Sequence, residues 1–357
     1  MRIPHLEDLP LLEGRKGIVK TFTILNEFVN GHKKVSVKWD GAPAIVAGIH
    51  PDSKKFFVGT KAVFHKTKPK ICYSVDDIDN YYHEVPDLKN KLTQALLYLP
   101  DLNYDGVYQG DFLFYRPSAH AERNFKFQPN TIIYEIDVFD EQMFGFAVHT
   151  KYQGLDQKTA TPTTAQEFSR SDNIWLVDGE YDSEILDNID TKIGNSALAL
   201  ILETAKLIDD DFLEELETTS KMSRLFYDVM CDCANNNTFP QFFSVLDEVS
   251  EKVIKFQKDR YEQDPIISRI PLENRKNFIK KLEDNSKNIQ HLFMFVYGVM
   301  TIKQLILRAL AENSPYNTYV YKDGKQVPCT PEGYVVDGVK LVDREQFTYN
   351  NHLNNKE

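Results

Sequence analysis

The spacing of apolar residues changes twice along this 357-residue sequence, near residue 160 and near Pro315. Strand-like alternation dominates the first part, whereas apolar residues recur at i, i+3 and i+4 in the second, as in amphipathic helices. Strand-like runs return after Pro315, on either side of an Asp337-Gly338 pair that is typical of a hairpin turn. We therefore expect an α+β fold in which a strand-rich core is interrupted by an all-helical insertion.

These patterns predict three segments: a core segment over residues 1–158, a helical insertion over 159–315, and C-terminal strands over 316–357 that complete the core. In the first segment we expect helices over Lys16–Val29 and Asp76–Tyr98. The expected strands are Val35–Trp39, Ala42–Ile49, Lys55–Gly59, Gly106–Tyr115, Thr131–Phe139, Phe144–His149, Thr318–Tyr321, Gly333–Val336 and Val339–Val342. The expected helices of the insertion are Ile193–Ile208, Phe212–Asn235, Pro240–Tyr261, Leu272–Asn285 and Ile289–Glu312.

The composition, with 42% hydrophobic residues, is that of a globular protein with a full core. The four cysteines form no Cys-x-x-Cys pair, so we expect neither a zinc site nor a disulfide framework, and a reduced, cytoplasmic setting fits best. No apolar run of signal-peptide length opens the sequence. The most apolar stretch, Leu292–Ile302, is short for a bilayer and predicts the central helix of a bundle, so no membrane partner is expected.

The formal net charge of −11 is concentrated in the middle of the chain. Residues 160–315 hold 27 acidic and 17 basic residues, whereas the rest is nearly balanced with 26 and 25. The first segment contains a basic run, GTKAVFHKTKPK, beginning at Gly59. Such a run can steer a polyanion, although a solvated lysine-rich loop would have the same composition.

The clearest candidate for chemistry is Lys38, which stands where a predicted strand enters the turn Trp39-Asp40-Gly41. A lysine there can project into a pocket while neighbouring backbone N–H groups face a phosphate. To act as a nucleophile the amine must lose its proton, which burial or cationic neighbours would favour. Taken alone, Lys-x-Asp-Gly is a weak pattern, and a surface turn is the simple alternative.

Three further segments follow in a suggestive order: Tyr108–Phe114, Glu332–Val336 and Val339–Val342. Together with the segment around Lys38, they resemble motifs III, IV, V and I of the covalent nucleotidyltransferases, the superfamily of ATP-dependent DNA and RNA ligases and mRNA capping enzymes. The resemblance implies an ATP-grasp-like nucleotidyltransferase core of antiparallel sheets and helices. It covers residues 33–140 and 328–345, and a bacteriophage RNA ligase-like protein is the nearest analogy.

The resemblance also implies roles for individual residues. Lys38 would attack the α-phosphate of ATP, and Lys340 would stabilise charge on that phosphate. Glu332 and Asp111 would hold Mg²⁺ (or Mn²⁺) or the ribose. The implied nucleotide-binding residues are Trp39, Asp40, Gly41, Thr60, Lys61, Asp111, Tyr134 and Glu332, with Tyr134, or alternatively Phe146, stacking on adenine. The implied nucleic-acid-binding residues are Lys61, Lys66, Lys68 and Lys70.

Some of these residues have plainer interpretations, and some positions depart from the motifs. Asp111 could be an acid on an edge strand and Tyr134 a core aromatic, and His149 with Thr150 fits a hydrogen-bonded pair better than a catalyst. Asp111 stands where motif III has Glu, and Asp337 stands where a lysine usually follows motif IV. Motif V has only Lys340 in place of two lysines, and we expect no OB-fold after it.

The sequence thus predicts an ATP-dependent polynucleotide ligase that works through a lysyl-AMP intermediate and an adenylylated 5′-phosphate. Its partner would be a nucleic acid with 5′-phosphate and 3′-hydroxyl ends, RNA rather than DNA, in the host cytoplasm if the gene is phage-encoded. One alternative passes AMP to a non-nucleic-acid acceptor, since the acidic insertion would repel a polyanion and could bind a protein partner. The other is a catalytically degenerate nucleic-acid-binding or structural protein, because lysines are missing from motifs IV and V.

Overall fold

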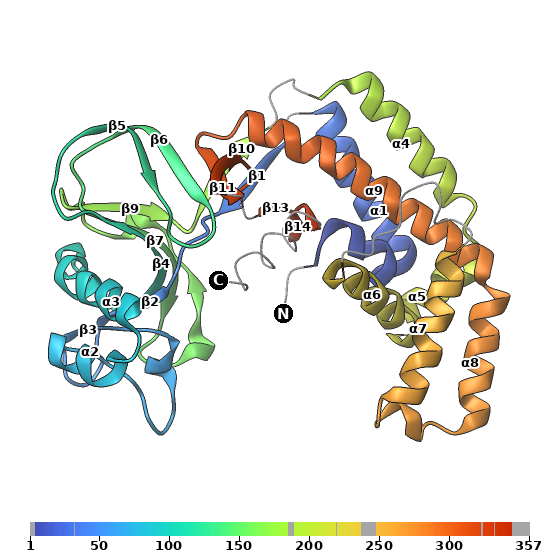
Figure 1. Ribbon diagram of the computed structural model, residues 1–357, viewed down its shortest axis with the longest axis horizontal. Helices are drawn as coiled ribbons and strands as arrows, with labels where there is room; N and C mark the ends of the chain where they lie inside the picture. Colours follow the sequence, from blue (N-terminus) through green and yellow to red (C-terminus); the bar gives the residue numbers. More distant parts are fainter. Residues whose placement is uncertain are drawn as a thin grey trace. The chain divides into compact units, whose positions relative to one another are not determined.

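A computed structural model describes residues 4–31, 33–184, 189–218, 220–236, 248–322, 324–331 and 333–344, and its secondary structure is α+β, as expected. The described chain forms two compact units (Figure 1). The strand-rich unit contains Ser36–Ser183 and Ser314–Gly333. The helical unit contains Met1–Val35, Glu184–Asn313 and Tyr334–Glu357.

The larger sheet of the strand-rich unit is mainly antiparallel. Its strand order is β3 (Phe56–Gly59), β2 (Ala44–Ile49), β4 (Val107–Tyr115), β7 (Phe144–Tyr152) and β8 (Thr161–Pro162), and β9 (Ile174–Asp178) pairs with β7 in parallel. Helices α2 (Val75–Tyr82) and α3 (Pro86–Tyr98) cover one face of this sheet (Figure 1). The core on that face includes Ile45, Ile78, Leu92, Tyr108, Phe112 and Phe146.

The smaller sheet has the order β12 (Lys325–Pro328), β11 (Asn317–Lys322), β6 (Ile133–Phe139) and β5 (Glu122–Phe127). Strand β11 pairs antiparallel with β6, with Thr318 opposite Tyr134, so the chain does return to this unit after the helices. An aromatic core lies against this sheet and includes Trp39, Phe114, Phe125, Phe127, Tyr134 and Phe139. Strand β1 (Lys34–Lys38) neighbours β10 (Glu180–Glu184) in a third sheet.

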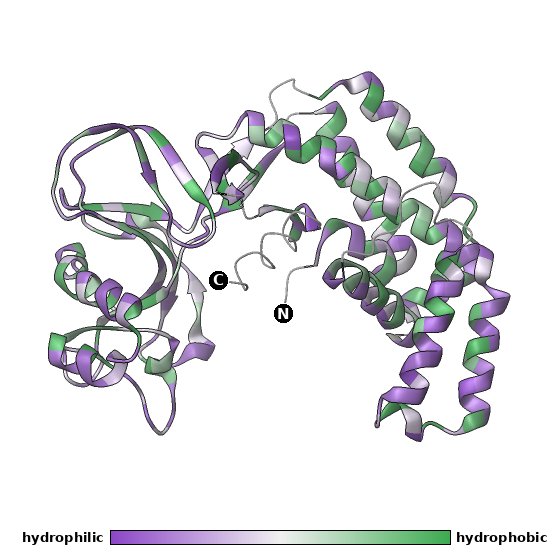
Figure 2. Cartoon of the chain, viewed as in Figure 1, coloured by the Kyte–Doolittle hydropathy of each residue, from purple (hydrophilic) through white to green (hydrophobic). Residues whose placement is uncertain are grey.

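The helical unit is built around α9 (Ser286–Glu312) and α1 (Leu9–Asn30). Helix α1 packs against α4 (Thr191–Ala205), α5 (Asp210–Thr218), α6 (Ser220–Asn235) and α9. The peripheral helices are α7 (Val249–Gln263) and α8 (Leu272–Asp284), which Figure 2 shows to be mostly hydrophilic. Within α1, Gly14 has a φ of +54°, and a Cβ there would lie 2.5 Å from the carbonyl oxygen of Leu213, so α5 can approach only because this residue is glycine.

Helix α9 is longer than the apolar stretch Leu292–Ile302 that the sequence singled out. It is the only described helix long and apolar enough to cross a membrane by those two criteria, and 72% of its most apolar window is buried. A buried core helix meets the same criteria. The prediction that Leu292–Ile302 belongs to a central helix of the helical unit is therefore confirmed.

The division into units differs from the expected one at three places. Residues before Ser36 group with the helices, because the apolar side of α1 is buried against other helices and not against a sheet. Residues 159–183 group with the strands, because β8 and β9 pair with β7. The hairpin of β13 (Tyr334–Val336) and β14 (Val339–Leu341) groups with the helical unit, whereas β11 and β12 join the strand-rich unit.

Candidate active site at the end of strand β1

Lys38 is the last residue of β1 and presents its amine at the surface. Its backbone N–H donates to the Gly333 carbonyl over 3.2 Å, which fixes the strand end. The side chain is 56% exposed, and its Nζ lies 3.8 Å from Oδ2 of Asp111, whose own side chain is only 7% exposed. The strand end therefore combines an accessible amine with a buried carboxylate.

Asp111 belongs to a central strand, because β4 lies between β2 and β7. The alternative of an edge-strand acid is therefore wrong. Asp111 is opposite Ala44 of β2 and Ala147 of β7. Since side chains alternate along a strand, Tyr108 and Phe112 point towards α2 and α3, while Asp111 and Gln109 point to the other face. The Tyr152 hydroxyl donates to the amide oxygen of Gln109 over 2.8 Å on that second face.

His149 of β7 is a third member of this polar cluster. Its Nε2 lies 3.8 Å from Oδ1 of Asp111, and its Nδ1 lies 2.6 Å from the Thr150 hydroxyl oxygen. The expected His149–Thr150 hydrogen bond is thus present, but sequence reasoning missed the contact with Asp111. A shift in the β4–β7 register after Gln109 accompanies this arrangement, and only the pairing of the two strands reveals it. We call Lys38, Asp111 and His149 the lysine cluster.

The expected nucleotide-binding role of Asp40 is corrected by its environment. The carboxylate is buried and accepts hydrogen bonds from the side chain of Asn130 (2.9 Å) and from the backbone N–H groups of Thr131 (2.7 Å) and Ile132 (2.8 Å). Its own N–H donates to the Tyr134 hydroxyl over 2.8 Å. Asp40 therefore fastens the loop after Lys38 to the start of β6 and has little capacity left for a ligand.

The expected stacking aromatics are also core residues. Tyr134 is fully buried, with its ring stacked on Phe127 at 5.4 Å and tilted against Trp39 at 5.0 Å. Phe146 is buried against α2 and α3, and Trp39 is buried and donates its indole N–H to the Asp178 carbonyl. None of these three rings has a free face for adenine, so the core alternative for Tyr134 is the correct one.

Gly41 allows the loop to lie directly over β4. A Cβ at this position would be 2.5 Å from Cβ of Asp111 and 3.1 Å from the Phe112 carbonyl oxygen. The following backbone continues this contact, because the N–H of Ala42 donates to that same oxygen over 3.1 Å. The role of Gly41 is therefore close packing of the loop beside Asp111.

The basic run divides into exposed and engaged side chains. Lys61, Lys66 and Lys68 are exposed, and no carboxylate pairs with them among the residues that the structure describes. Lys70 instead donates to the Tyr81 carbonyl over 3.4 Å. The Thr60 hydroxyl caps the short helix Lys61–Phe64 by accepting from the Ala62 N–H. Only the three exposed lysines of this run are free to meet a polyanion.

The two expected residues from the C-terminal motifs have different outcomes. Glu332 lies outside the described residues. Lys340 lies in β14 opposite Val335, and the predicted turn is confirmed, since Asp337 and Gly338 have φ values of +48° and +75°. The Lys340 N–H donates to the Pro4 carbonyl over 2.9 Å, so this strand is tied to the N-terminal segment of the helical unit.

Of the two metal ligands expected from the motifs, Asp111 lies among the described residues and Glu332 does not. Across the described ranges, no group of three or more His, Cys, Asp or Glu side chains could hold a metal ion. Mg²⁺ is commonly bound through one or two carboxylates together with substrate phosphates. A single buried carboxylate beside an accessible amine fits an ion that arrives with a nucleotide.

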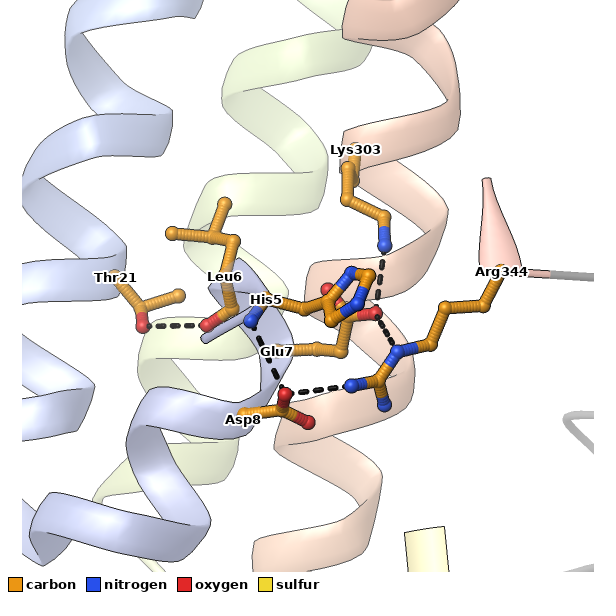
Figure 3. Close-up of polar contacts among 7 residues, drawn as sticks. All are labelled: His5, Leu6, Glu7, Asp8, Thr21, Lys303 and Arg344. Atoms are coloured by element: carbon orange, nitrogen blue, oxygen red, sulfur yellow. Dashed lines mark hydrogen bonds and ion pairs between the residues drawn. The ribbon is translucent and has the colours of Figure 1, made fainter. Parts of the chain in front are cut away.

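A second charged cluster lies inside the helical unit (Figure 3). Lys303 of α9 bonds Oε1 of Glu7 at 2.7 Å, and Arg344 contacts the same oxygen at 3.3 Å and Oδ2 of Asp8 at 2.5 Å. The backbone N–H of His5 also donates to Asp8. Two acids and two bases balance each other here and are almost fully buried, so this ion cluster joins the N-terminal segment to α9 and to Arg344.

The strand-rich unit of this α+β chain has an accessible lysine beside a buried aspartate, and that aspartate lies on the sheet face opposite α2 and α3. The chain belongs to DUF6267, a family of unknown function, because the family profile matches residues 2–356. No match was found among the curated proteins or among the solved structures.

Proposed function

We propose that this chain is an ATP-dependent nucleotidyltransferase that joins polynucleotide ends, with RNA as the expected substrate. The observation that carries the proposal is the position of Lys38, whose amine is accessible at the end of β1 and lies 3.8 Å from the buried carboxylate of Asp111. The exposed amine can reach a substrate, and the Asp111 carboxylate beside it can hold it in position.

In the proposed reaction, the exposed amine of Lys38 first gives up a proton to solvent. Its amine then forms a bond to the α-phosphorus of ATP, and the bond to the β-phosphate oxygen breaks, releasing pyrophosphate. A polynucleotide 5′-phosphate oxygen next attacks the same phosphorus, the phosphorus–nitrogen bond to Lys38 breaks, and the lysine amine takes up a proton. Finally a 3′-hydroxyl attacks the end phosphate and expels AMP. Mg²⁺ would offset phosphate charge, with Asp111 and, outside the described residues, Glu332 as its protein ligands.

The exposed lysines Lys61, Lys66 and Lys68 support a polynucleotide as acceptor. They carry three positive charges on one short segment of the strand-rich unit, and none of them has an ion-pair partner in the described part of the chain. Polyanion binding that uses three such charges should have a salt slope of about −2, from about −0.7 for each phosphate contacted on a single strand. Replacing all three by Ala should remove about that slope from single-stranded RNA binding, measured by fluorescence anisotropy over a salt series.

The decisive experiment is the intact mass of the protein after incubation with ATP and Mg²⁺. We expect one AMP adduct on the wild type and none on Lys38→Ala. Lys34→Ala is the matched control, because Lys34 is an exposed lysine on the same strand and should leave adduct formation unchanged. An adduct that persists in Lys38→Ala would refute the role of Lys38.

One observation favours the degenerate alternative, namely that the aromatic rings expected to hold adenine are buried in the core. A binding protein of this kind would bind RNA in a salt-sensitive way and form no adduct with any nucleoside triphosphate. If an adduct forms, adding 5′-phosphorylated RNA to the purified adduct separates the two enzyme hypotheses. Transfer of AMP to the RNA supports ligation, and its retention on the protein directs the search to other acceptors.

A further inference from the structure

Helix α4 carries a line of exposed apolar side chains. Ile193, Leu200 and Leu207 are 56%, 58% and 57% exposed. They are seven residues apart, which is almost two helical turns, so they follow one side of the helix. Leu207 lies in the turn directly after α4, and its N–H donates to the Thr204 carbonyl, so the chain still follows a helical path there. We call these three residues the α4 stripe.

The α4 stripe is additional to the apolar side with which α4 packs into its own unit. Gly194, Leu198 and Ile201 are buried on that side. The fit there is close, because a Cβ on Gly194 would lie 2.6 Å from the Val29 side chain. The apolar arc of α4 is therefore wider than its own unit covers, and Figure 2 shows hydrophobic residues along this helix.

A groove beside the first turn of α4 extends the apolar surface. Its lining includes Ile193 of the α4 stripe together with Ile189 and, from α9, Leu305 and Ala309. The charged side chains of Asp190, Arg308 and Glu312 complete the lining. An apolar strip with a charged rim is the usual composition of a protein–protein contact.

We propose that a second copy of this chain covers the α4 stripe, with the two α4 helices antiparallel and a twofold axis at Leu200. The spacing is symmetric about Leu200, since Ile193 is seven residues before it and Leu207 seven residues after it. In a twofold antiparallel pair, Leu200 meets itself and Ile193 meets the partner's Leu207. The stripe is therefore complementary to its own copy, as a closed dimer requires.

The charges at the two ends of the stripe agree with this pairing. Lys192 stands next to Ile193, and Asp211 follows shortly after Leu207. Both side chains are exposed, and within the described chain neither forms an ion pair. Antiparallel pairing brings Lys192 of each copy towards the acidic Asp209–Asp211 run of the other, which produces two equivalent attractions. A parallel pair would instead place Lys192 beside Lys192.

Sedimentation equilibrium over a concentration series tests the proposal on the full chain. The wild type should dimerise, and Leu200→Glu should raise the dimer dissociation constant roughly 100-fold, because a charge is placed against its own copy at the centre of the contact. Ala199→Glu is the matched control, since Ala199 is exposed but lies about 100° around α4 from Leu200, outside the α4 stripe, and should leave the constant nearly unchanged. A wild type that stays monomeric, or that forms larger open assemblies, would overturn the proposal.

Crosslinking tests the twofold axis independently of any effect on folding. In a Leu200→Cys variant, two copies of the new cysteine should form a disulfide under mild oxidation, giving a covalent dimer on a non-reducing gel. Ala199→Cys should not, and the wild type measures the background from the native cysteines. Equal crosslinking at both positions would contradict the antiparallel arrangement, even if the protein is dimeric.

Discussion

The buried ion cluster should make the stability of the helical unit depend on pH through two opposing groups. Burial and the charge of Arg344 lower the pKa of His5 from 6.5 to about 3. Burial, reinforced by Glu7, raises the pKa of Asp8 from 3.8 to about 6, although Arg344 acts against it. Between pH 5 and 6, His5 is therefore protonated in the unfolded chain and neutral in the folded chain. Asp8 is the reverse case, because it is protonated in the folded chain and ionised in the unfolded chain.

These two effects have opposite signs. The neutral His5 contributes stability above pH 6.5 that is lost as the pH falls towards 3, and the protonated Asp8 contributes stability at low pH that is lost as the pH rises through 6. In the wild type they nearly cancel between pH 5 and 6. One pKa unit corresponds to about 1.4 kcal/mol, and titration is partial, so each group contributes about 1 kcal/mol over this interval.

Asp8→Asn should therefore uncover the His5 effect. Relative to the wild type, its free energy of unfolding should rise by about 1 kcal/mol from pH 5 to pH 6, whereas that of His5→Gln should fall by about the same amount. His5→Gln keeps the backbone N–H that His5 donates to Asp8, so that contribution to the pKa of Asp8 is retained in this variant. Glu7, whose pKa is lowered to about 2 because Lys303 and Arg344 outweigh its burial, stays ionised in this range.

Urea unfolding followed by far-UV circular dichroism would measure these free energies for the helical unit. The chain has two tryptophans, Trp39 and Trp175, and both lie in the strand-rich unit, so fluorescence in the same samples reports the other unit as a control. If wild-type and Asp8→Asn stabilities run parallel from pH 5 to pH 6, the raised pKa of Asp8 is refuted. A change that is equally large in fluorescence would show that the effect does not belong to the ion cluster.

Three further substitutions test the packing and charge of the two units. Gly41→Ala should destabilise the strand-rich unit by about 1–3 kcal/mol, because its Cβ would lie 2.5 Å from that of Asp111. A Cβ on Gly106 would make only ordinary contacts, at 3.8 Å or more, so Gly106→Ala should have little effect in the same urea titration. Asp40→Ala should cost about 2–4 kcal/mol, measured by tryptophan fluorescence, since it leaves three hydrogen-bond donors at residues 130–132 without their acceptor. Lys303→Met should lower the stability of the helical unit by about 3 kcal/mol, because it breaks a buried ion pair with Glu7. This is the lower end of the usual cost, since Arg344 still contacts Glu7. Adding Glu7→Gln to the same chain should recover part of that loss.

The regular elements of this fold could be predicted from the sequence where the apolar pattern is long. Strands β2, β4 and β7 and helices α4, α8 and α9 all lie where their periodicity indicates. The pattern failed for short strands of charged residues, such as β5 (Glu122–Phe127) and β10 (Glu180–Glu184), because their pairing partners and not their own side chains determine their structure. It also could not show that α1 packs with helices that are distant in the sequence.

The lysine cluster shows a similar limit. Lys38 could be identified because a lysine between a strand and a Gly-containing turn is a local signal. Asp111 could be identified as polar within an apolar strand, but its contact with Lys38 depends on the loop that passes over β4. His149 faces Asp111 only because of the β4–β7 register, which is not encoded within either strand.

The residues that follow Lys38 in the sequence have structural roles, whereas the residue in contact with its amine is Asp111. Trp39 packs in the aromatic core, Asp40 accepts hydrogen bonds from a neighbouring loop, and Gly41 allows close packing over β4. The Lys38 amine instead contacts Asp111, which is distant in the sequence. Substitutions in the neighbouring residues should therefore reduce adduct formation through the stability of the strand-rich unit. Asp111→Asn keeps the shape of that side chain and removes only its charge, so a loss of adduct formation in a stable Asp111→Asn protein would be evidence of chemistry.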